Sequence, residues 1–424
     1  MPLFTHPWQP ELPDHRQPFP MPLGSTSETF PMHRRTFLAA SSAAVLLSSS
    51  LRAEDSSRRR VAVIGHSGRG NYGHGLDTVW RNVPETEIVA VADADQGGLA
   101  REVEKLKLDR GYADYRKMLL EVRPEFVAVS PRHPDQHLDM IMASIESGAR
   151  GIYCEKPFCR TPAEADALIA AATKQGTKIA VAHRNRYHPA LATITELLES
   201  GEMGRLLEIR GKGKGDRRGG DEDLWVLGSH VLNLVTYFCG APKTVSAVMR
   251  KEGRLVTADD VYPGGEGLGP LAADEVRARY EMEDGTIAYY DSVANDGTGP
   301  DGYCMQLVGS KGVVTLHIDR TPIAHFTPGN PFKPASAGKP WIPITSAGVG
   351  KEEPNPELVR SVHNHILPVR DLIESVDQGR DPICDIREGA TTVEMICGVF
   401  QSHRENGQAV SLPLKNRDNA LADW

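Results

Sequence analysis

A β-branched run at residues 60–64 leads directly into a six-residue turn, residues 65–70, in which three positions are glycine. We expect a helix at residues 72–81, and a second β-branched run at residues 88–92 ends at Asp93. Strand, glycine turn, helix, strand and acid follow one another in this order in the βαβ unit that binds a dinucleotide. The glycines let the main chain approach the pyrophosphate, and N–H groups at the start of the helix hold it.

Five positions of this turn are predicted to contact the dinucleotide. Ser67 occupies the place of the usual middle glycine, and Gly68 beside it can provide the close main-chain approach. Asp93 stands where a carboxylate accepts hydrogen bonds from both ribose hydroxyls and repels a 2′-phosphate, so NAD is expected rather than NADP. The predicted contacts in the turn are Gly65, Ser67, Gly68, Arg69 and Gly70.

Strands and helices continue to alternate as far as residue 183. Such alternation predicts a parallel, doubly wound sheet, so we assign residues 58–183 to an NAD-binding Rossmann domain. The further strands are expected at residues 126–129, 151–154 and 178–182, and the further helices at residues 136–147 and 162–174.

Residues 184–424 show a different pattern. Their strand-like runs alternate apolar and polar residues and are joined by turns at residues 283–285 and 310–312, which predicts a mainly antiparallel sheet with one wet face. Residues 320–357 are rich in proline and glycine and are expected to form a long ordered insertion or lid. Strands are expected at residues 206–210, 244–250, 276–282, 286–291, 303–308 and 313–317, and helices at residues 189–200, 364–378 and 387–406.

The first 57 residues lack a pattern typical of a folded domain. Residues 1–31 are proline-rich and are interpreted as a disordered or mis-started extension, with Met32 as the true start. Arg34 and Arg35, followed by a short apolar run, are typical of a twin-arginine export signal, so residues 32–57 are assigned to signal and linker. The apolar run is too short and too serine-rich for a stable membrane span. An uncleaved disordered tail is the alternative.

Export by this route predicts a periplasmic or other extracytoplasmic location, reached through the export machinery in the folded state. A nicotinamide cofactor has no free pool to exchange with there, so it is expected to be tightly bound. Tight retention favours chemistry that returns the cofactor to its starting state in each cycle.

Charge and residue spacing exclude two kinds of partner. A formal net charge of -8 leaves no excess positive charge to replace phosphate counterions, which argues against nucleic-acid binding. The six cysteines include no Cys-x-x-Cys pair, and His133, His137 and His188 lack the spacing of metal ligands on one element. We therefore expect no metal site.

Several short stretches resemble the Gfo/Idh/MocA family of oxidoreductases, which includes glucose-fructose oxidoreductase and inositol dehydrogenase. The most specific of them is Glu155-Lys156-Pro157, in the loop after the strand expected at residues 151–154. The resemblance covers residues 58–415. The other matching stretches are the turn at residues 65–70, Asp93, Ser130-Pro131 followed by His137, residues 185–189, residues 228–230 and residues 410–414.

The resemblance implies a Rossmann half and a C-terminal α/β half built on a large open sheet, with the substrate between the nicotinamide and that sheet. It implies that Ser130, Pro131, His137, Glu155 and Lys156 contact the cofactor or line its site. The substrate that it implies is a sugar, polyol or glycoside. Sheets of this sort also dimerise in the family, so a homo-oligomer, dimer or tetramer, is expected.

Lys156 and His230 are the predicted catalytic residues. Lys156 lies in a loop at the carboxyl end of a parallel strand, where open α/β sheets bind ligands, and it can relay a substrate proton. His230 can shuttle a proton at neutral pH. In the family this histidine works with an aspartate four residues earlier, whereas this chain has Val226 there and Asp223 out of register. The alternative for His230 is a histidine with a structural role, and the alternative for Lys156 is an exposed lysine in an ion pair.

Arg186 and Tyr187 are predicted to contact substrate hydroxyls together with His230, and packing at the domain junction is the alternative for the first two.

The leading interpretation is oxidation of a secondary alcohol, in which Lys156 and His230 move the proton and hydride passes to NAD. In a second interpretation, bound NAD oxidises the sugar transiently, elimination or hydrolysis follows, and the product is reduced back. The export signal and the missing aspartate favour this cycling mechanism. In a third interpretation the protein binds a sugar or cofactor without catalysis. This remains open because fold alone does not determine function.

Overall fold

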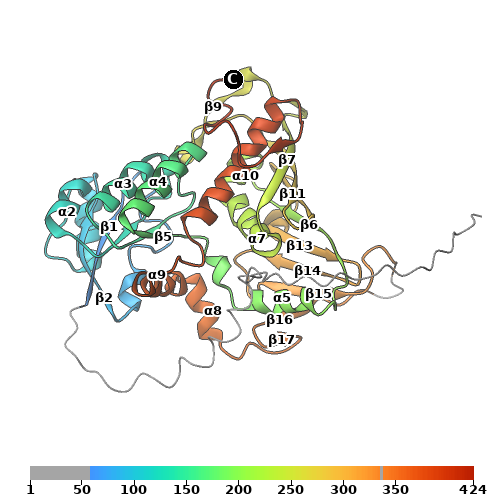
Figure 1. The fold of residues 1–424 in the computed structure, drawn as a ribbon, viewed down its shortest axis with the longest axis horizontal. Coiled ribbons are helices and arrows are strands. Elements are labelled where there is room, and N and C mark those ends of the chain that lie inside the picture. The colour runs from blue at the N-terminus through green and yellow to red at the C-terminus, as the bar shows by residue number, and fades with distance from the viewer. Residues whose placement is uncertain (1–57, 335–337) are drawn as a thin grey trace, which may run out of the picture. The chain divides into compact units, whose positions relative to one another are not determined.

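Five parallel strands form the first sheet, in the order β2-β1-β3-β4-β5 (Figure 1). The computed structural model describes residues 58–334 and 338–424. Both β3 and β4 are buried along their whole length, as expected for parallel strands covered on both faces. The predicted parallel sheet is confirmed. Its strands are β1 (Arg59–Ile64), β2 (Thr86–Ala92), β3 (Phe126–Val129), β4 (Gly151–Cys154) and β5 (Lys178–Val181).

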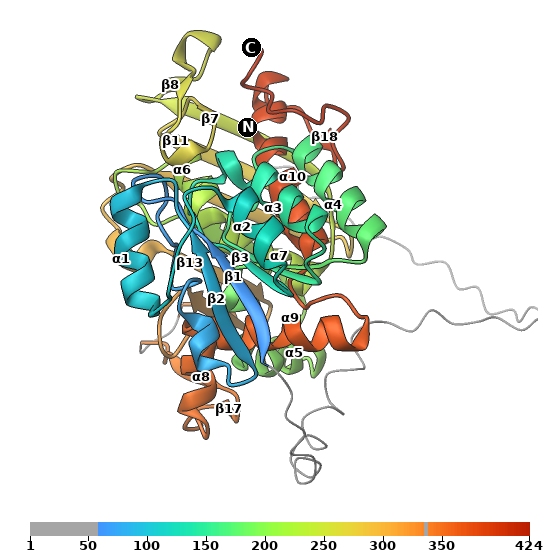
Figure 2. The same cartoon turned by 90° about the vertical axis from the view of Figure 1, so that its left-hand side faces the viewer.

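Helices α2 (Tyr115–Val122), α3 (His137–Glu146) and α4 (Pro162–Gln175) lie on one side of this sheet, and α9 (Ile366–Gln378) lies on the other (Figure 1). Figure 2 shows the sheet with α1 (Gln96–Leu106) at its left and α3 and α4 at its right. The parallel sheet is therefore covered on both faces, and one of its covering helices comes from the end of the chain.

The helix predicted at residues 72–81 is absent, and this prediction was wrong. Turns occupy the stretch, followed by the short 3-10 helix η2 (Val79–Asn82). Gly70, Gly73 and Gly75 have φ values of 86°, 60° and 90°, which a right-handed helix does not allow. The apolar face left open beneath them is covered by Trp80 and by α9, which packs on β4, β5 and η2.

The second sheet is larger and has the order β17-β16-β15-β14-β13-β6-β12-β11-β7-β18, with β8 paired to β7. All its pairings are antiparallel except that of β6 with β12. Buried residues alternate with more exposed ones along β11, so one face packs on the core, and the predicted mainly antiparallel sheet is confirmed. The strands are β6 (Leu206–Lys212), β7 (Pro242–Lys251), β8 (Arg254–Leu255), β11 (Glu275–Met282), β12 (Ile287–Val293), β13 (Cys304–Gly309), β14 (Gly312–His317), β15 (Ala324–Pro328), β16 (Ile342–Thr345), β17 (Gly348–Val349) and β18 (Val410–Ser411).

Residues 320–357, for which the sequence predicts an insertion or lid, contribute β15, β16 and β17 to the edge of this sheet. A separate pair, β9 (Tyr262–Pro263) and β10 (Pro270–Leu271), frames a short glycine-rich loop. The remaining helices are α5 (Ala190–Glu199), α6 (Asp221–Asp223), α7 (Ser229–Cys239), α8 (Pro356–His363) and α10 (Ile386–Arg404).

The helix α10 joins the two halves, because it packs against β7 of the large sheet and also against α4 and β5 of the Rossmann half (Figure 1). One apolar cluster accordingly contains Ile64 of the parallel sheet, Tyr290 of the large sheet and Phe400 of α10. None of the helices in the described residues has the length and apolar character needed to cross a membrane. The predicted export signal lies outside the described residues.

We predict that Leu372→Ala lowers the free energy of unfolding by about 2–5 kcal/mol, because Leu372 of α9 is fully buried against the parallel sheet. Urea unfolding followed by circular dichroism measures the change. The matched control is Leu120→Ala, whose side chain is 70% exposed and whose removal is expected to change stability by less than about 0.5 kcal/mol. Equal effects of the two variants would contradict the role assigned to α9.

Candidate active site and dinucleotide pocket

The glycine turn after β1 closes on itself instead of opening into a helix. His66 and Asn71 exchange main-chain hydrogen bonds of 3.1 and 2.9 Å, and the N–H of Gly68 donates to the Asn71 side chain at 2.9 Å. The expected row of N–H donors at a helix start is therefore missing here. Any pyrophosphate contact must come from the main chain of the turn itself.

Two glycines let this turn lie against the neighbouring loops. A Cβ at Gly70 would lie 2.5 Å from the main-chain nitrogen of Arg132, and one at Gly73 would lie 2.6 Å from Cγ of Glu155. Both distances are shorter than any real contact, so only glycine fits at either position. The turn is thereby fixed against the loop after β3 and against Glu155 after β4.

Asp93 directly follows β2, as predicted, and its side chain already has a full set of hydrogen bonds. The Ser67 N–H lies 3.0 Å from both carboxylate oxygens, and the Ser67 hydroxyl donates at 2.7 Å. The Tyr72 hydroxyl donates at 2.8 Å, and the N–H of Asp95 donates at 2.9 Å. A carboxylate offers about four acceptor sites, and Asp93 is only 1% exposed. A ribose must therefore displace one or more of these donors.

Tyr72 lies across the start of the turn. A Cβ added at Gly65 would lie 2.1 Å from its ring, and the Lys105 ammonium lies 5.7 Å from the ring centroid. Burial and the hydrogen bond to Asp93 raise the pKa of Tyr72 well above its ordinary value, so the hydroxyl stays protonated and remains a donor. Tyr72 is a residue of this site that no sequence motif marks.

A pocket of about 140 Å³ opens beside Asp93, between the ends of β1 and β2 and the start of α2 and α3. Ligands of open α/β sheets bind at this carboxyl edge, and the lining is mostly apolar, as suits a nucleoside base. The residues present thus fit the adenosine half of a dinucleotide. The lining residues are Gly65, His66, Ala92, Asp93, Ala94, Ala113, Asp114, Tyr115, Gln136 and Met140.

Other residues predicted to contact the cofactor shape the loop after β3. Arg69 forms an ion pair with Asp135, which links the glycine turn to this loop. His137 is fully buried and its Nε2 bonds the carbonyl of Pro131 at 2.7 Å. Burial lowers the pKa of His137, so it is a neutral packing residue in this arrangement. The hydroxyl of Ser130 is buried without a hydrogen-bond partner in the described part of the chain.

Glu155 and Lys156 follow β4 directly. Glu155 is fully buried, forms an ion pair with His74, and accepts a 2.6 Å hydrogen bond from the N–H of Lys156. Burial opposes its ionisation, but the contacts with His74, together with the charge of Lys156, outweigh this effect and lower the pKa of Glu155 to about 2. Glu155 is therefore an anion that fixes the main chain beside Lys156.

The Lys156 side chain reaches from the parallel sheet to the C-terminal half. Its Nζ donates to the carbonyl oxygen of Val226 at 2.7 Å, and the residue is 5% exposed. Burial lowers the pKa of Lys156, while the charges of Glu155, Glu266 and Asp319 oppose that shift. The predicted catalytic lysine is thus a buried group held by a main-chain carbonyl.

His230, near the start of α7, lies in the same buried group and is 7% exposed. Its neighbour is His183, whose ring centroid lies 5.3 Å away with the ring planes at 88°. Burial, followed by the positive charge of Lys156, lowers the pKa of His230 well below its ordinary value. The structure therefore brings the two predicted catalytic residues together and adds His183, which sequence reasoning missed.

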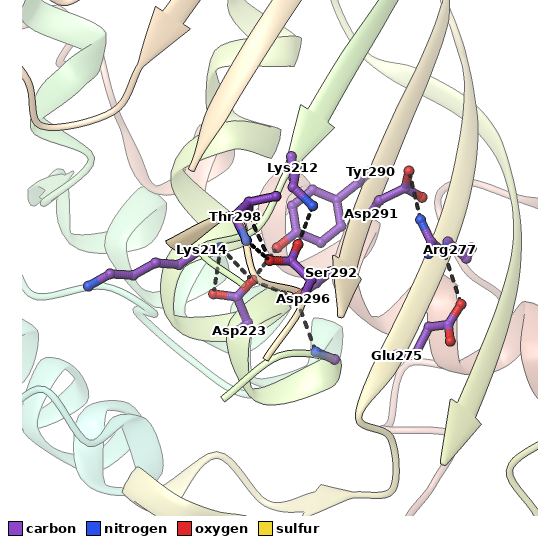
Figure 3. A network of polar contacts seen from close by, with 11 residues as sticks. Lys212, Lys214, Asp223, Glu275, Arg277, Tyr290, Asp291, Ser292, Asp296 and Thr298 are labelled. Carbon is purple, nitrogen blue, oxygen red and sulfur yellow. Dashed lines mark hydrogen bonds and ion pairs between the residues drawn. The ribbon is translucent and has the colours of Figure 1, made fainter. Parts of the chain in front are cut away.

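Val226, four residues before His230, belongs to a π-helical turn, η5 (Leu224–Gly228). Such turns in helices are often found at functional sites. The neighbouring acid Asp223 points elsewhere: it accepts hydrogen bonds from Ser292 at 2.6 Å, from Tyr290 at 3.2 Å and from the Lys214 N–H at 3.2 Å (Figure 3). Asp223 therefore anchors the loop after β6 and does not pair with His230.

Further charged groups that the sequence analysis did not select lie around Lys156. Arg184 forms an ion pair with Asp319 at 2.9 Å and donates to the carbonyl of His363 at 2.7 Å. Glu266 has a left-handed φ of 52° and lies on η7 (Gly265–Gly267), which packs against η3 (Pro134–Gln136). The position of His183 and Arg184 directly after a parallel strand was the signal that could have found them.

Arg186 and Tyr187, predicted to contact substrate, have their polar groups engaged by the protein. Arg186 pairs with Glu388 at 2.7 Å. The Tyr187 hydroxyl donates to Asp371 at 2.9 Å and accepts from the N–H of Cys384 at 3.2 Å. These contacts join the short segment after β5 to α9 and to the start of α10. Within residues 58–334 and 338–424, no three His, Cys, Asp or Glu side chains are grouped so that they could hold a metal ion.

Two family models match this chain. The model described as the NAD-binding Rossmann fold of the Gfo/Idh/MocA oxidoreductase family matches residues 59–183. The model described as the C-terminal alpha/beta domain of the same family matches residues 196–412. The two matches follow the two sheets of the structure.

Curated relatives match over part of their length. D-apiose dehydrogenase of Paraburkholderia graminis is 31% identical over 125 residues, which is 30% of this chain and 33% of that protein. Levoglucosan dehydrogenase of Pseudarthrobacter phenanthrenivorans is 24% identical over 263 residues, 56% of this chain and 66% of that protein. The chain thus spans between one third and two thirds of the length of these relatives.

Solved structures share the fold. Levoglucosan dehydrogenase in complex with NADH and levoglucosan has a TM-score of 0.66 at 19% identity, covering 84% of this chain and 100% of that chain. An oxidoreductase domain protein from Kribbella flavida has a TM-score of 0.66 at 20% identity, covering 84% of this chain and 99% of that chain. With the two family models, the glycine turn and Glu155-Lys156-Pro157, these matches establish that the chain belongs to the Gfo/Idh/MocA family of oxidoreductases, with an NAD-binding Rossmann domain and a C-terminal α/β domain.

Proposed function

We propose that this chain is an NAD-dependent oxidoreductase that acts on a sugar, polyol or glycoside. The observation that carries the proposal is the buried group of Lys156, His183 and His230 beside the carboxyl ends of β4 and β5. This edge is where α/β sheets bind ligands, and lysine and histidine are suited to proton transfer. The substrate class is supported by relatives named as D-apiose and levoglucosan dehydrogenases.

NAD, when bound, supplies the hydride acceptor for oxidation of an alcohol. His230 is uncharged at neutral pH because its pKa is lowered, so it is free to accept the proton of a substrate hydroxyl. Lys156 is held by the Val226 carbonyl and can donate to the same oxygen, which stabilises the negative charge that develops there.

The adenosine half of NAD is assigned to the pocket beside Asp93, and the main chain of residues 65–70 is assigned to the pyrophosphate. In this assignment Asp93 accepts a hydrogen bond from a ribose hydroxyl after the hydroxyl of Tyr72 or Ser67 has moved away from the carboxylate. We propose that the cofactor remains bound between turnovers.

A second candidate is the cycling mechanism, in which a transient keto-sugar undergoes elimination or hydrolysis before the sugar is reduced again. One observation favours it: among the described residues, neither Lys156 nor His230 has a hydrogen-bonded carboxylate partner. A cation beside imidazoles of low proton affinity suits the stabilisation of an alkoxide or enolate. The same group is less suited to net oxidation, in which a residue must take up the proton of the substrate hydroxyl and later release it.

We further propose that Arg34 and Arg35 direct export of the folded chain and that it works as a homo-oligomer, dimer or tetramer. The double variant Arg34→Lys with Arg35→Lys is expected to remain in the cytoplasm of a bacterial host, whereas the parent chain appears in the periplasmic fraction. Light scattering of the periplasmic protein measures its mass. Equal distribution of both chains would contradict export, and a monomer mass would contradict the oligomer.

The reaction is tested by a screen of polyols, sugars and glycosides with the purified protein, following NADH absorbance and product mass together. Stoichiometric NADH is expected for the dehydrogenase, and product without net NADH is expected for the cycling mechanism. Turnover by Lys156→Ala is expected to fall about 10²- to 10⁴-fold, the usual contribution of a proton-transfer group. The control is Lys178→Ala, which removes only a surface ion pair with Asp381. No product from any substrate would support a binding protein instead.

Tyr72→Phe is expected to bind NAD about two- to tenfold more tightly than the parent chain. The variant frees one acceptor site on Asp93 while it keeps the ring against Gly65. The size follows from the ~0.5–1.5 kcal/mol net value of a hydrogen bond. Calorimetry with NAD measures the dissociation constant. Tyr112→Phe, which loses a hydroxyl bonded to Glu121, is the control. Unchanged or weaker binding by Tyr72→Phe would rule out competition between Tyr72 and the ribose.

A further inference from the structure

His183 occupies the sharp bend that directly follows β5. Its N–H donates to the carbonyl of Val181 at 2.7 Å, two residues back, and its own carbonyl accepts from the N–H of Arg186. This bend places the imidazole beside His230 on α7, with only 3% of the residue exposed. A parallel strand and the helix after the π turn are thus joined by two histidine rings.

The two rings differ from other buried histidines of this chain. His137, His365 and His403 each have a ring nitrogen in a hydrogen bond, to Pro131, Tyr153 and Val256 respectively. His365 leaves its other ring nitrogen, Nε2, buried without a partner, but His183 and His230 have no ring hydrogen bond in the described ranges, and the Nδ1 atom of each is buried. A buried polar atom without a partner costs about 1–3 kcal/mol. A histidine that served packing alone is easily replaced by an apolar residue, so this arrangement points to a use.

Four side chains from three segments face His230, and none of them is acidic. They are Lys156 after β4, His183 and Arg184 after β5, and His74 in the stretch after β1. The edge-to-face contact of the rings is an attractive geometry that does not need a proton between them. Charging either imidazole beside the Lys156 ammonium is unfavourable, and burial lowers the pKa of His183 to about 3. At neutral pH both rings are therefore uncharged.

We propose that His183 is a positioning residue of the proton-transfer group: its ring packs against the His230 imidazole, fixes its orientation and shields its Nδ1 from water. Together with the Val226 carbonyl that holds Lys156, it takes the place of the carboxylate missing one helical turn before His230. This inference rests on the proposed function, since it assigns His230 the role of proton acceptor.

Two variants of His183 distinguish the effect of its aromatic ring from the effect of its ring nitrogen atoms. His183→Phe keeps an aromatic ring against His230 and offers no hydrogen bond. His183→Gln removes the ring, and its amide oxygen can accept a hydrogen bond from a protonated His230, which favours the charged form. The pKa of His230 is therefore expected to rise in the glutamine variant by about one unit, and to stay low in the phenylalanine variant.

The test is a pH titration of the whole protein labelled with ¹⁵N-histidine, with the His230 signals assigned through His230→Gln. His188→Gln is the matched control, because His188 is also buried and has its pKa lowered to about 4, but it lies beside His363 and not beside His230. The His230 pKa is expected to be equally low in the parent chain, in His188→Gln and in His183→Phe. It is expected to be higher in His183→Gln. Melting temperatures of all variants report folding.

An unchanged His230 titration in His183→Gln would overturn the proposal, as would equal rises in both His183 variants. If His183→Gln fails to fold, a raised His230 pKa in His183→Phe overturns it and a low one supports it. The titration needs neither substrate nor NAD, so loss of the proposed function in the substrate screen leaves this test intact. With a substrate in hand, His183→Gln is expected to lower kcat with little change in KM and to move the acid limb of kcat/KM to higher pH.

Discussion

A single hydrogen bond from a buried ammonium sets the geometry of the candidate active site. Removing a lysine charge from water is costly unless the protein solvates it, and here the Val226 carbonyl lies 2.7 Å from Nζ of Lys156. The bond ties the end of β4 to the π turn before α7, so the parallel sheet and the helix that carries His230 are fixed relative to each other. Burial lowers the pKa of His183 and His230, and the charge of the same ammonium adds to this effect, so both rings are neutral. Proton affinity across the site therefore follows first from burial and then from where this cation is placed.

A second constraint acts at the dinucleotide turn, where Asp93 must be satisfied because it is almost completely buried. Ser67 and Tyr72 meet this need with hydroxyl donors at 2.7 and 2.8 Å. The substitution of the usual middle glycine by Ser67 thus has a structural purpose. Gly98 leaves room for it, since a Cβ there would lie 2.0 Å from the Ser67 hydroxyl.

The sequence predicted both sheets and most elements because their signals are local: buried β-branched runs, alternating strands, and helices such as α4, which is capped by Thr161 and ended by Gly176. It failed at residues 72–81, where a helix was expected after the glycine turn and the closely spaced glycines prevented one. The chain compensates with α9, nearly 300 residues later, and no local pattern shows that contact. Lys156 and His230 could be selected from motifs. For His183 and Arg184 the only local signal is their position after a parallel strand, and Tyr72 has none, because the roles of all three arise from side chains brought together by the fold.

The donors around Asp93 bear on how a cofactor is held. A buried carboxylate without donors would destabilise the empty protein, and Ser67 and Tyr72 prevent this, so the chain can fold before NAD arrives. When the ribose replaces a hydroxyl of the protein, one hydrogen bond to Asp93 is exchanged for another of similar strength. The acid therefore contributes selectivity for a free 2′-hydroxyl more than it contributes net affinity. Retention of the dinucleotide must then depend on the apolar pocket beside Asp93 and on the loops that close around it, including the contact between η7 and η3.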